Sequence, residues 1–151
     1  MDGVTYQQAF DYAVEVFEQA LPACAKRGVT ICMEPLTHQE TNFCQTAQQT
    51  VDLIERINHP NFRLLLDTKA MTFEEAGRPA TIRKFAQHLA HYHANDENLN
   101  GRGWGDVDFG PIFGALRDVG YKDYMSVEVF KFEPGPEAIA AKSLAYLKSF
   151  V

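Results

Sequence analysis

Four residues that can bind a metal ion each follow a short apolar segment of the chain. They are Glu34, Asp67, His93 and Glu128, and successive members of this set lie 33, 26 and 35 positions apart. One strand, one helix and two loops need about 30 residues, so such a residue recurs once per structural unit, at the same end of each apolar segment. Two glutamates, one aspartate and one histidine form an oxygen-rich set with one imidazole. This set suits Mn²⁺, Mg²⁺ or Co²⁺, with Zn²⁺ as an alternative, although a structural zinc site would favour thiolates.

The apolar segments are predicted to be strands that alternate with helices. The strands are expected at 29–33, 62–66, 89–93 and 124–129. Apolar periodicity, caps and breakers predict helices at 5–26, 47–57, 80–86, 109–119 and 136–150, with a short helix from Thr72. This alternation indicates a parallel α/β sheet. In such sheets the site lies at the carboxyl ends of the strands, where all four candidate ligands are placed.

Length and composition predict one globular domain that spans residues 1–151. The net charge of −6 argues against nucleic acid as a partner. The three cysteines have no C-x-x-C spacing, so we expect reduced thiols in a cytoplasmic protein. No run of 18 apolar residues and no leader-like pattern at residues 1–4 is found, so neither a membrane partner nor a signal peptide is expected.

Five motifs, in their order and spacing, resemble the xylose isomerase-like (β/α)₈ barrel superfamily, in particular the sugar isomerase/epimerase branch that includes the ketose 3-epimerases. They are MEPL…ETNF at 33–43, LLLDTKAM at 64–71, HYHAND at 91–96, GRGWGDVDF at 101–109 and SVEVF at 126–130. The resemblance covers nearly the whole chain, but only the C-terminal half of the family's barrel. It therefore implies a four-stranded half of a TIM barrel, built from parallel strand–helix repeats.

The resemblance also implies a function, that of a metal-dependent sugar isomerase or epimerase of carbohydrate metabolism. The family's metal ligands correspond to Glu34, Asp67, His93 and Glu128. Glu34 and Glu128 would also be the catalytic residues on opposite faces of a ketose or related sugar. One would remove the proton beside the carbonyl group and the other would return one, while the metal stabilises the intervening enediolate.

Further residues are candidate substrate contacts, and each also has a structural interpretation. Lys69 and His38 could be solvated, Trp104 could fill the space under its loop, and a histidine such as His91 is more often structural. The epimerases usually carry a substrate-binding His and Arg where this chain has Ala70 and Leu99, which leaves Arg102 as the nearest basic candidate. The full set is His38, Glu40, Asn42, Lys69, His91, Arg102 and Trp104.

A half-barrel has two open sheet edges and an uncovered inner face, which we expect to be apolar. We therefore expect a homodimer or higher homo-oligomer in which two halves complete a barrel-like core, or else a truncated form whose other half is lost. Two other functions stay open: a non-catalytic half-barrel fragment, and a metal hydrolase related to endonucleases that act on abasic DNA. The hydrolase would need additional ligands, of which His91 is the obvious spare.

Overall fold

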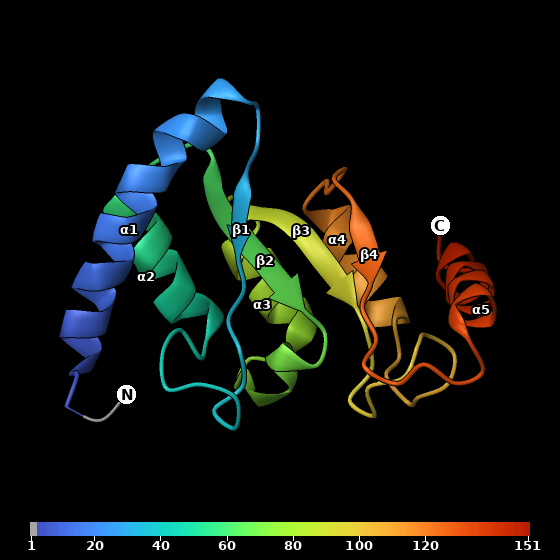
Figure 1. The fold of residues 1–151 in the computed structure, drawn as a ribbon. Coiled ribbons are helices and arrows are strands. Elements are labelled where there is room, and N and C mark those ends of the chain that lie inside the picture. Colours follow the sequence, from blue (N-terminus) through green and yellow to red (C-terminus); the bar gives the residue numbers. More distant parts are fainter. Residues whose placement is uncertain (1–2) are drawn as a thin grey trace.

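The computed structural model describes residues 3–151 and contains a four-stranded parallel sheet in the order β1-β2-β3-β4 (Figure 1). Met1 and Asp2, which begin the segment expected to carry no leader, lie outside the described residues. Each strand neighbours the next one along the chain, the order expected for half of a (β/α)₈ barrel. The elements are α1 (Tyr6–Lys26), β1 (Ile31–Met33), α2 (Ala47–Ile57), β2 (Phe62–Asp67), the 3-10 helix η1 (Ala70–Phe73), α3 (Arg78–Phe85), β3 (Leu89–Ala94), α4 (Gly110–Asp118), β4 (Met125–Val127) and α5 (Pro136–Lys148).

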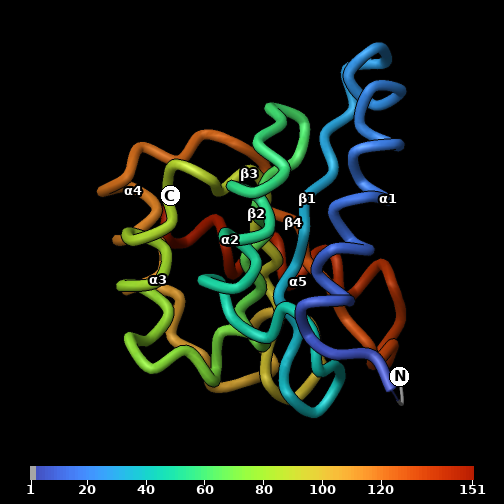
Figure 2. The backbone as a smooth tube through the Cα atoms, turned by 90° about the vertical axis from the view of Figure 1, so that its left-hand side faces the viewer, coloured from blue at the N-terminus to red at the C-terminus, as the bar shows by residue number. Residues whose placement is uncertain are grey.

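The helices cover one face of the curved sheet and its two ends. Figure 1 shows α1 and α2 beside β1, and α5 beyond β4. In Figure 2 the strands lie between α3 and α4 on one side and α1 on the other. The inner strand β2 supplies the fully buried Phe62, Leu64 and Leu66 to the main apolar core, and its position confirms the strand predicted at 62–66. No helix among residues 3–151 is long and apolar enough to span a membrane.

Several element boundaries differ from the predicted ones. The two outer strands are shorter than expected because each pairs with a neighbour on one side only, and Tyr124 before β4 is 85% exposed. The helix α1 continues through Pro22. The helix expected from Thr72 is the 3-10 helix η1, and α3 begins at Arg78 with Pro79 in its first turn, where a missing N–H breaks no helical bond.

The inner face of the sheet is largely polar, so the expected apolar inner face is wrong. Parallel neighbours in register point to the same side of a sheet. The register pairs Cys32 with Arg63 and Leu65 with His91 along the inner face. The ring Nε2 of His91 also lies 2.6 Å from the Ser126 hydroxyl. The apolar side chains of the strands therefore pack outward against the helices, while the barrel interior carries polar groups.

Shortening a buried side chain of β2 should lower stability because helices enclose that side chain. Leu64→Ala removes a side chain with 0% exposure, and we expect a loss of about 2–5 kcal/mol in the free energy of unfolding. Urea unfolding measures this loss. The control Phe132→Ala trims a side chain that is 67% exposed and should change stability by less than about 0.5 kcal/mol; equal losses in both variants would contradict the assigned core.

Candidate metal centre

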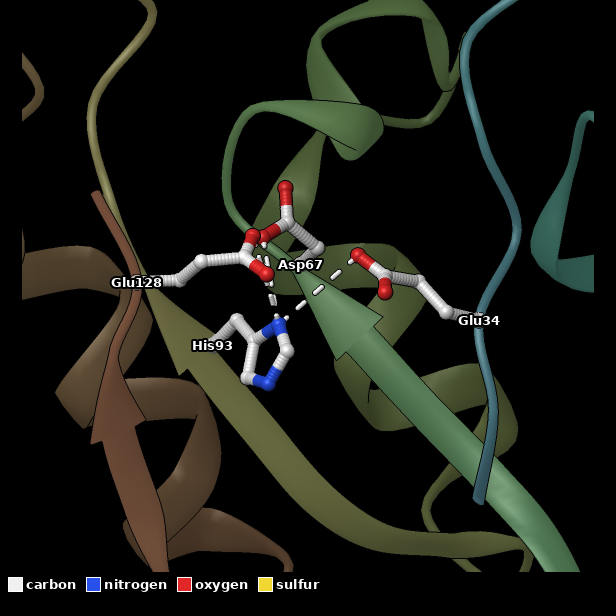
Figure 3. A group of neighbouring side chains, drawn as sticks. All are labelled: Glu34, Asp67, His93 and Glu128. Carbon is white, nitrogen blue, oxygen red and sulfur yellow. Dashed lines mark ion pairs between the residues drawn. The ribbon is translucent and has the colours of Figure 1, made fainter. Parts of the chain in front are cut away.

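The parallel sheet brings the four predicted ligands to one edge. Glu34 and Glu128 directly follow β1 and β4, Asp67 ends β2, and His93 lies opposite Asp67 in the register of β3. Figure 3 shows the four side chains pointing toward one another, with Glu34 and Glu128 reaching in from opposite sides. One ligand atom of each residue lies within 4.8 Å of the other three ligand atoms. Positions far apart in the sequence thus form a single cluster.

The ring Nδ1 of His93 lies at the centre of this cluster. It is 3.8 Å from Glu34 Oε1, 3.7 Å from Asp67 Oδ2 and 3.6 Å from Glu128 Oε2, the contacts dashed in Figure 3. These separations are too long for hydrogen bonds, and Nδ1 is buried without a hydrogen-bond partner. Ligand atoms about 2.1 Å from a shared ion are typically about 3–4 Å from one another. The donor set and its spacing therefore fit a divalent cation.

Burial and like charge shape the electrostatics of the cluster. Asp67 is 2% exposed, and desolvation, together with the neighbouring Glu34 and Glu128, raises its pKa to about 6. The Ala70 N–H, 2.7 Å from Asp67 Oδ1, opposes this rise. The pKa of His93 is raised above its ordinary value, chiefly by the Glu34 carboxylate. The metal-free cluster thus favours protonation, whereas a divalent cation would favour the charged carboxylates.

A small cavity of about 60 Å³ adjoins the cluster. It contains two of the predicted substrate contacts, Glu40 and Lys69, whose Oε1 and Nζ atoms are 2.6 Å apart. The lysine, with help from Thr37, lowers the pKa of Glu40. The Lys69 charge is thus already paired inside the chain. The cavity is lined by Glu34, Leu36, Glu40, Asp67, Lys69, Ala70, Asn95, Glu128 and Phe130.

The other predicted substrate contacts do not line this cavity. The exposed His38 packs edge-on against Phe73, with ring centroids 4.4 Å apart. Asn42 is exposed on its loop, and His91 bonds to Ser126 below the cluster. Trp104 packs under the Lys142 ammonium, which lies 3.9 Å from its ring centroid. His38, His91 and Trp104 thus have local partners outside the cavity, and Asn42 is exposed.

Arg102 corrects the expectation of a basic substrate contact, because it is 0% exposed. Its guanidinium group donates to the Asp96 carboxylate and to the carbonyl oxygens of Asn95 and Val107. The group also lies 4.0 Å from the ring centroid of Phe109. Arg102 therefore anchors the loop after β3 from within, and no part of its side chain reaches the cavity.

Asn95 is a member of the site that sequence reasoning missed. Its side-chain Nδ2 lies 2.5 Å from Asp67 Oδ2 and 3.4 Å from Glu128 Oε2. The available signal was strand alternation: Asn95 is two residues beyond His93 and points to the same side. The sequence instead favoured a loop at Asn95, because Asn and Gly residues dominate the segment that follows.

Fold and cluster together define half of a parallel α/β barrel with an oxygen-rich candidate metal centre at its carboxyl edge. The family model described as "Xylose isomerase-like TIM barrel" matches residues 2–150. The chain belongs to this family, which confirms the resemblance found in the sequence.

Among its relatives, the L-ribulose 3-epimerase of Mesorhizobium japonicum is 36% identical over 116 residues, which are 77% of this chain and 39% of that protein. The D-psicose 3-epimerase of Ruminiclostridium cellulolyticum is 31% identical over 121 residues, 80% of this chain and 41% of that protein. The crystal structure of D-psicose 3-epimerase from Clostridium cellulolyticum H10 superposes with a TM-score of 0.87 at 23% identity, over 99% of this chain and 57% of that chain. The chain thus spans about two fifths of the length of these sequence relatives, as expected for a half-barrel.

The raised pKa of Asp67 predicts how the stability of the metal-free chain changes with pH. Its ordinary value is 3.8 and its folded value about 6, so the folded state binds more protons than the unfolded state between these values. The stabilisation is complete below about pH 4 and is lost as the pH rises through 6. Relative to Asp67→Asn, the unfolding free energy of the unsubstituted chain should fall by about 2–3 kcal/mol between pH 4 and pH 7.

Urea unfolding in the presence of a chelator tests this pH dependence. The exposed Asp106→Asn serves as a control that should preserve the pH profile of the unsubstituted chain. Identical profiles for Asp67→Asn and the unsubstituted chain would contradict the assigned environment of Asp67.

Proposed function

We propose that the chain carries the metal and proton-transfer centre of a metal-dependent sugar isomerase or epimerase that acts on a ketose. The observation that carries this proposal is the cluster itself, in which ligand atoms from four strand ends lie within 4.8 Å of one another. Its relatives include ketose 3-epimerases, which supports a ketose as the substrate class. A bound divalent cation would supply Lewis-acid polarisation of the carbonyl and hydroxyl oxygens of the sugar.

Glu34 and Glu128 are assigned the proton transfers because they face each other across the cluster (Figure 3). One carboxylate takes the proton from the carbon beside the carbonyl group, and the electron pair of that C–H bond moves toward the carbonyl oxygen to give an enediolate. The opposite carboxyl group then returns a proton to the same carbon from the other face, which inverts its configuration. Asp67 and His93 would serve mainly as metal ligands, and both are less accessible than the two glutamates.

The size of the cavity favours completion of the pocket by another half-barrel. The cavity beside the cluster holds about 60 Å³, whereas ligand pockets usually hold about 300–1,000 Å³. All four candidate ligands come from this chain, and we infer that part of the substrate wall is supplied from outside residues 3–151. A non-catalytic fragment would share the incomplete wall, so turnover by the chain has to be measured directly.

We propose further that two copies associate through the two open edges of their sheets. Some of the exposed large apolar side chains lie on elements at the two ends of the sheet: Tyr12 and Val16 of α1 are 58% and 61% exposed, and Tyr124 before β4 and Leu144 of α5 are 85% and 53% exposed. Isolated exposed apolar residues are common, but here they occur at both ends of one sheet. Placing β4 of one copy beside β1 of the other would cover both ends with twofold symmetry.

Catalysis can be tested by solvent exchange at carbon 3 of a ketose. The chain loaded with Mn²⁺ should exchange the C3 proton of D-psicose or L-ribulose for deuterium in D₂O, followed by NMR. Glu34→Gln and Glu128→Gln each remove a proton-transfer group and should slow exchange by about 10²–10⁴-fold. The exposed Glu75→Gln should leave the rate unchanged. A Mn²⁺-loaded chain that exchanges no proton would support the non-catalytic alternative.

The association can be tested by placing a charge on each proposed edge. The unsubstituted chain should sediment with twice the chain mass, and Val16→Glu or Leu144→Glu should shift it toward the monomer because a charge is costly in an apolar contact. Gln87→Glu adds the same charge at an exposed position between α3 and β3, away from both edges, and should preserve the dimer. A monodisperse unsubstituted monomer at high concentration would exclude this mode of association.

A further inference from the structure

Asn95 is the one neutral side chain that bridges two carboxylates of the described cluster. It is 2% exposed. Its Oδ1 accepts a hydrogen bond from the backbone N–H of Lys69 at 3.0 Å. Because a backbone N–H can only donate, this bond fixes which end of the amide is oxygen. The other end must be the NH₂ group, and it faces Asp67 Oδ2 at 2.5 Å and Glu128 Oε2 at 3.4 Å.

This arrangement determines how the Asp67 carboxylate is oriented. Its Oδ1 accepts from the Ala70 N–H at 2.7 Å, and its Oδ2 accepts from Asn95 at 2.5 Å. Both oxygens are thus held, one from η1 and one from the end of β3, so the carboxylate cannot rotate freely. A carboxylate oxygen has two lone-pair sites, so Oδ2 keeps one free on the side of His93 Nδ1, 3.7 Å away.

The second contact of the amide reaches the strand on the other side of β3. Glu128 follows β4, whereas Asp67 ends β2, so one amide group links ligands from two strands that do not pair with each other. A neutral donor between two carboxylates lessens their repulsion without adding charge. The Nδ2 group has two hydrogens, which allows one bond to each carboxylate.

Asn95 is itself held by contacts that lie outside the cluster. Its carbonyl oxygen accepts from Arg102 at 3.2 Å, and the next residue, Asp96, pairs with the same guanidinium group. The backbone N–H of Arg102 donates to Ser143 of α5 at 2.9 Å. Gly105 lies so close to the Asp96 carboxyl group that a Cβ at this position would clash with it. The loop after β3 therefore anchors Asn95 independently of the ligands.

We propose that Asn95 is a positioning residue of the candidate metal centre, whose amide NH₂ group holds Asp67 and Glu128 in the orientation that binds a divalent cation. The proposal rests on the proposed function, since it concerns the same centre. Groups that hydrogen-bond to metal ligands typically change metal affinity by about 10–100-fold when they are removed. Arg102 supports the site indirectly, because its guanidinium group donates to the backbone carbonyl oxygen of Asn95.

Metal titration tests this role without reference to turnover. We expect Asn95→Ala to raise the dissociation constant for Mn²⁺ by about 10–100-fold relative to the unsubstituted chain, measured by calorimetry. The matched control is Asn98→Ala, which removes a bond from the same loop to the Trp104 carbonyl but touches no carboxylate of the cluster. Its dissociation constant should stay within about twofold.

An isosteric variant separates positioning from a merely structural role. Asn95→Leu keeps a side chain of similar size and adds no charge, but it removes the NH₂ donor that faces the two carboxylates. A merely structural role predicts a lower metal-free melting temperature with the same stabilisation by Mn²⁺ as in the unsubstituted chain. The positioning role predicts that the stabilisation by Mn²⁺ also becomes smaller.

The outcomes distinguish this inference from the proposed function. An unsubstituted chain that takes up no Mn²⁺ would overturn both. Uptake by the unsubstituted chain with the same affinity in Asn95→Ala would overturn the role of Asn95 alone. Equal weakening by Asn95→Ala and Asn98→Ala would also overturn it, because loop order rather than the amide would then set the affinity.

Discussion

Repulsion among the carboxylates of Glu34, Asp67 and Glu128 is the constraint on which the arrangement of the site depends. Their ligand atoms lie within 4.8 Å of one another and of His93, and like charges at such distances are unfavourable unless a cation or a proton compensates them. In the metal-free chain, burial and, to a smaller extent, the neighbouring Glu34 and Glu128 raise the pKa of Asp67. The parallel sheet imposes it, because all four strands end at the same edge and cannot separate without losing their pairing.

The two faces of the sheet have separate tasks. Phe62, Leu64 and Leu66 of β2 point outward and pack against helices in the main core. The inner face carries polar residues such as Arg63 and His91 and leads to the cluster at the carboxyl edge. Stability therefore resides mainly between sheet and helices, and the interior of the barrel is left for chemistry. The loop after β3 connects the two, since Asn95 and Arg102 join the cluster to α5.

The family relationship explains both the intact cluster and the small cavity. The chain aligns with about two fifths of the length of its ketose 3-epimerase relatives, and its own four strand ends carry the candidate ligands. In a complete barrel the inner faces of all strands surround one site. A half-barrel can supply a whole ligand set and still lack part of the wall that would enclose a sugar.

The sequence by itself determined the strand–helix alternation and the polar residue at each strand end, because both are local patterns that burial of apolar strands requires. The parallel order of the sheet and the four candidate ligands followed from them. Only the tertiary structure decided which nearby polar residues join the cluster. Asn95 contacts the cluster, whereas Arg102 is buried away from the cavity. Both positions depend on contacts with residues far away in sequence, Asp67 and Ser143 respectively. The polar inner face likewise became evident only once the register of neighbouring strands was known.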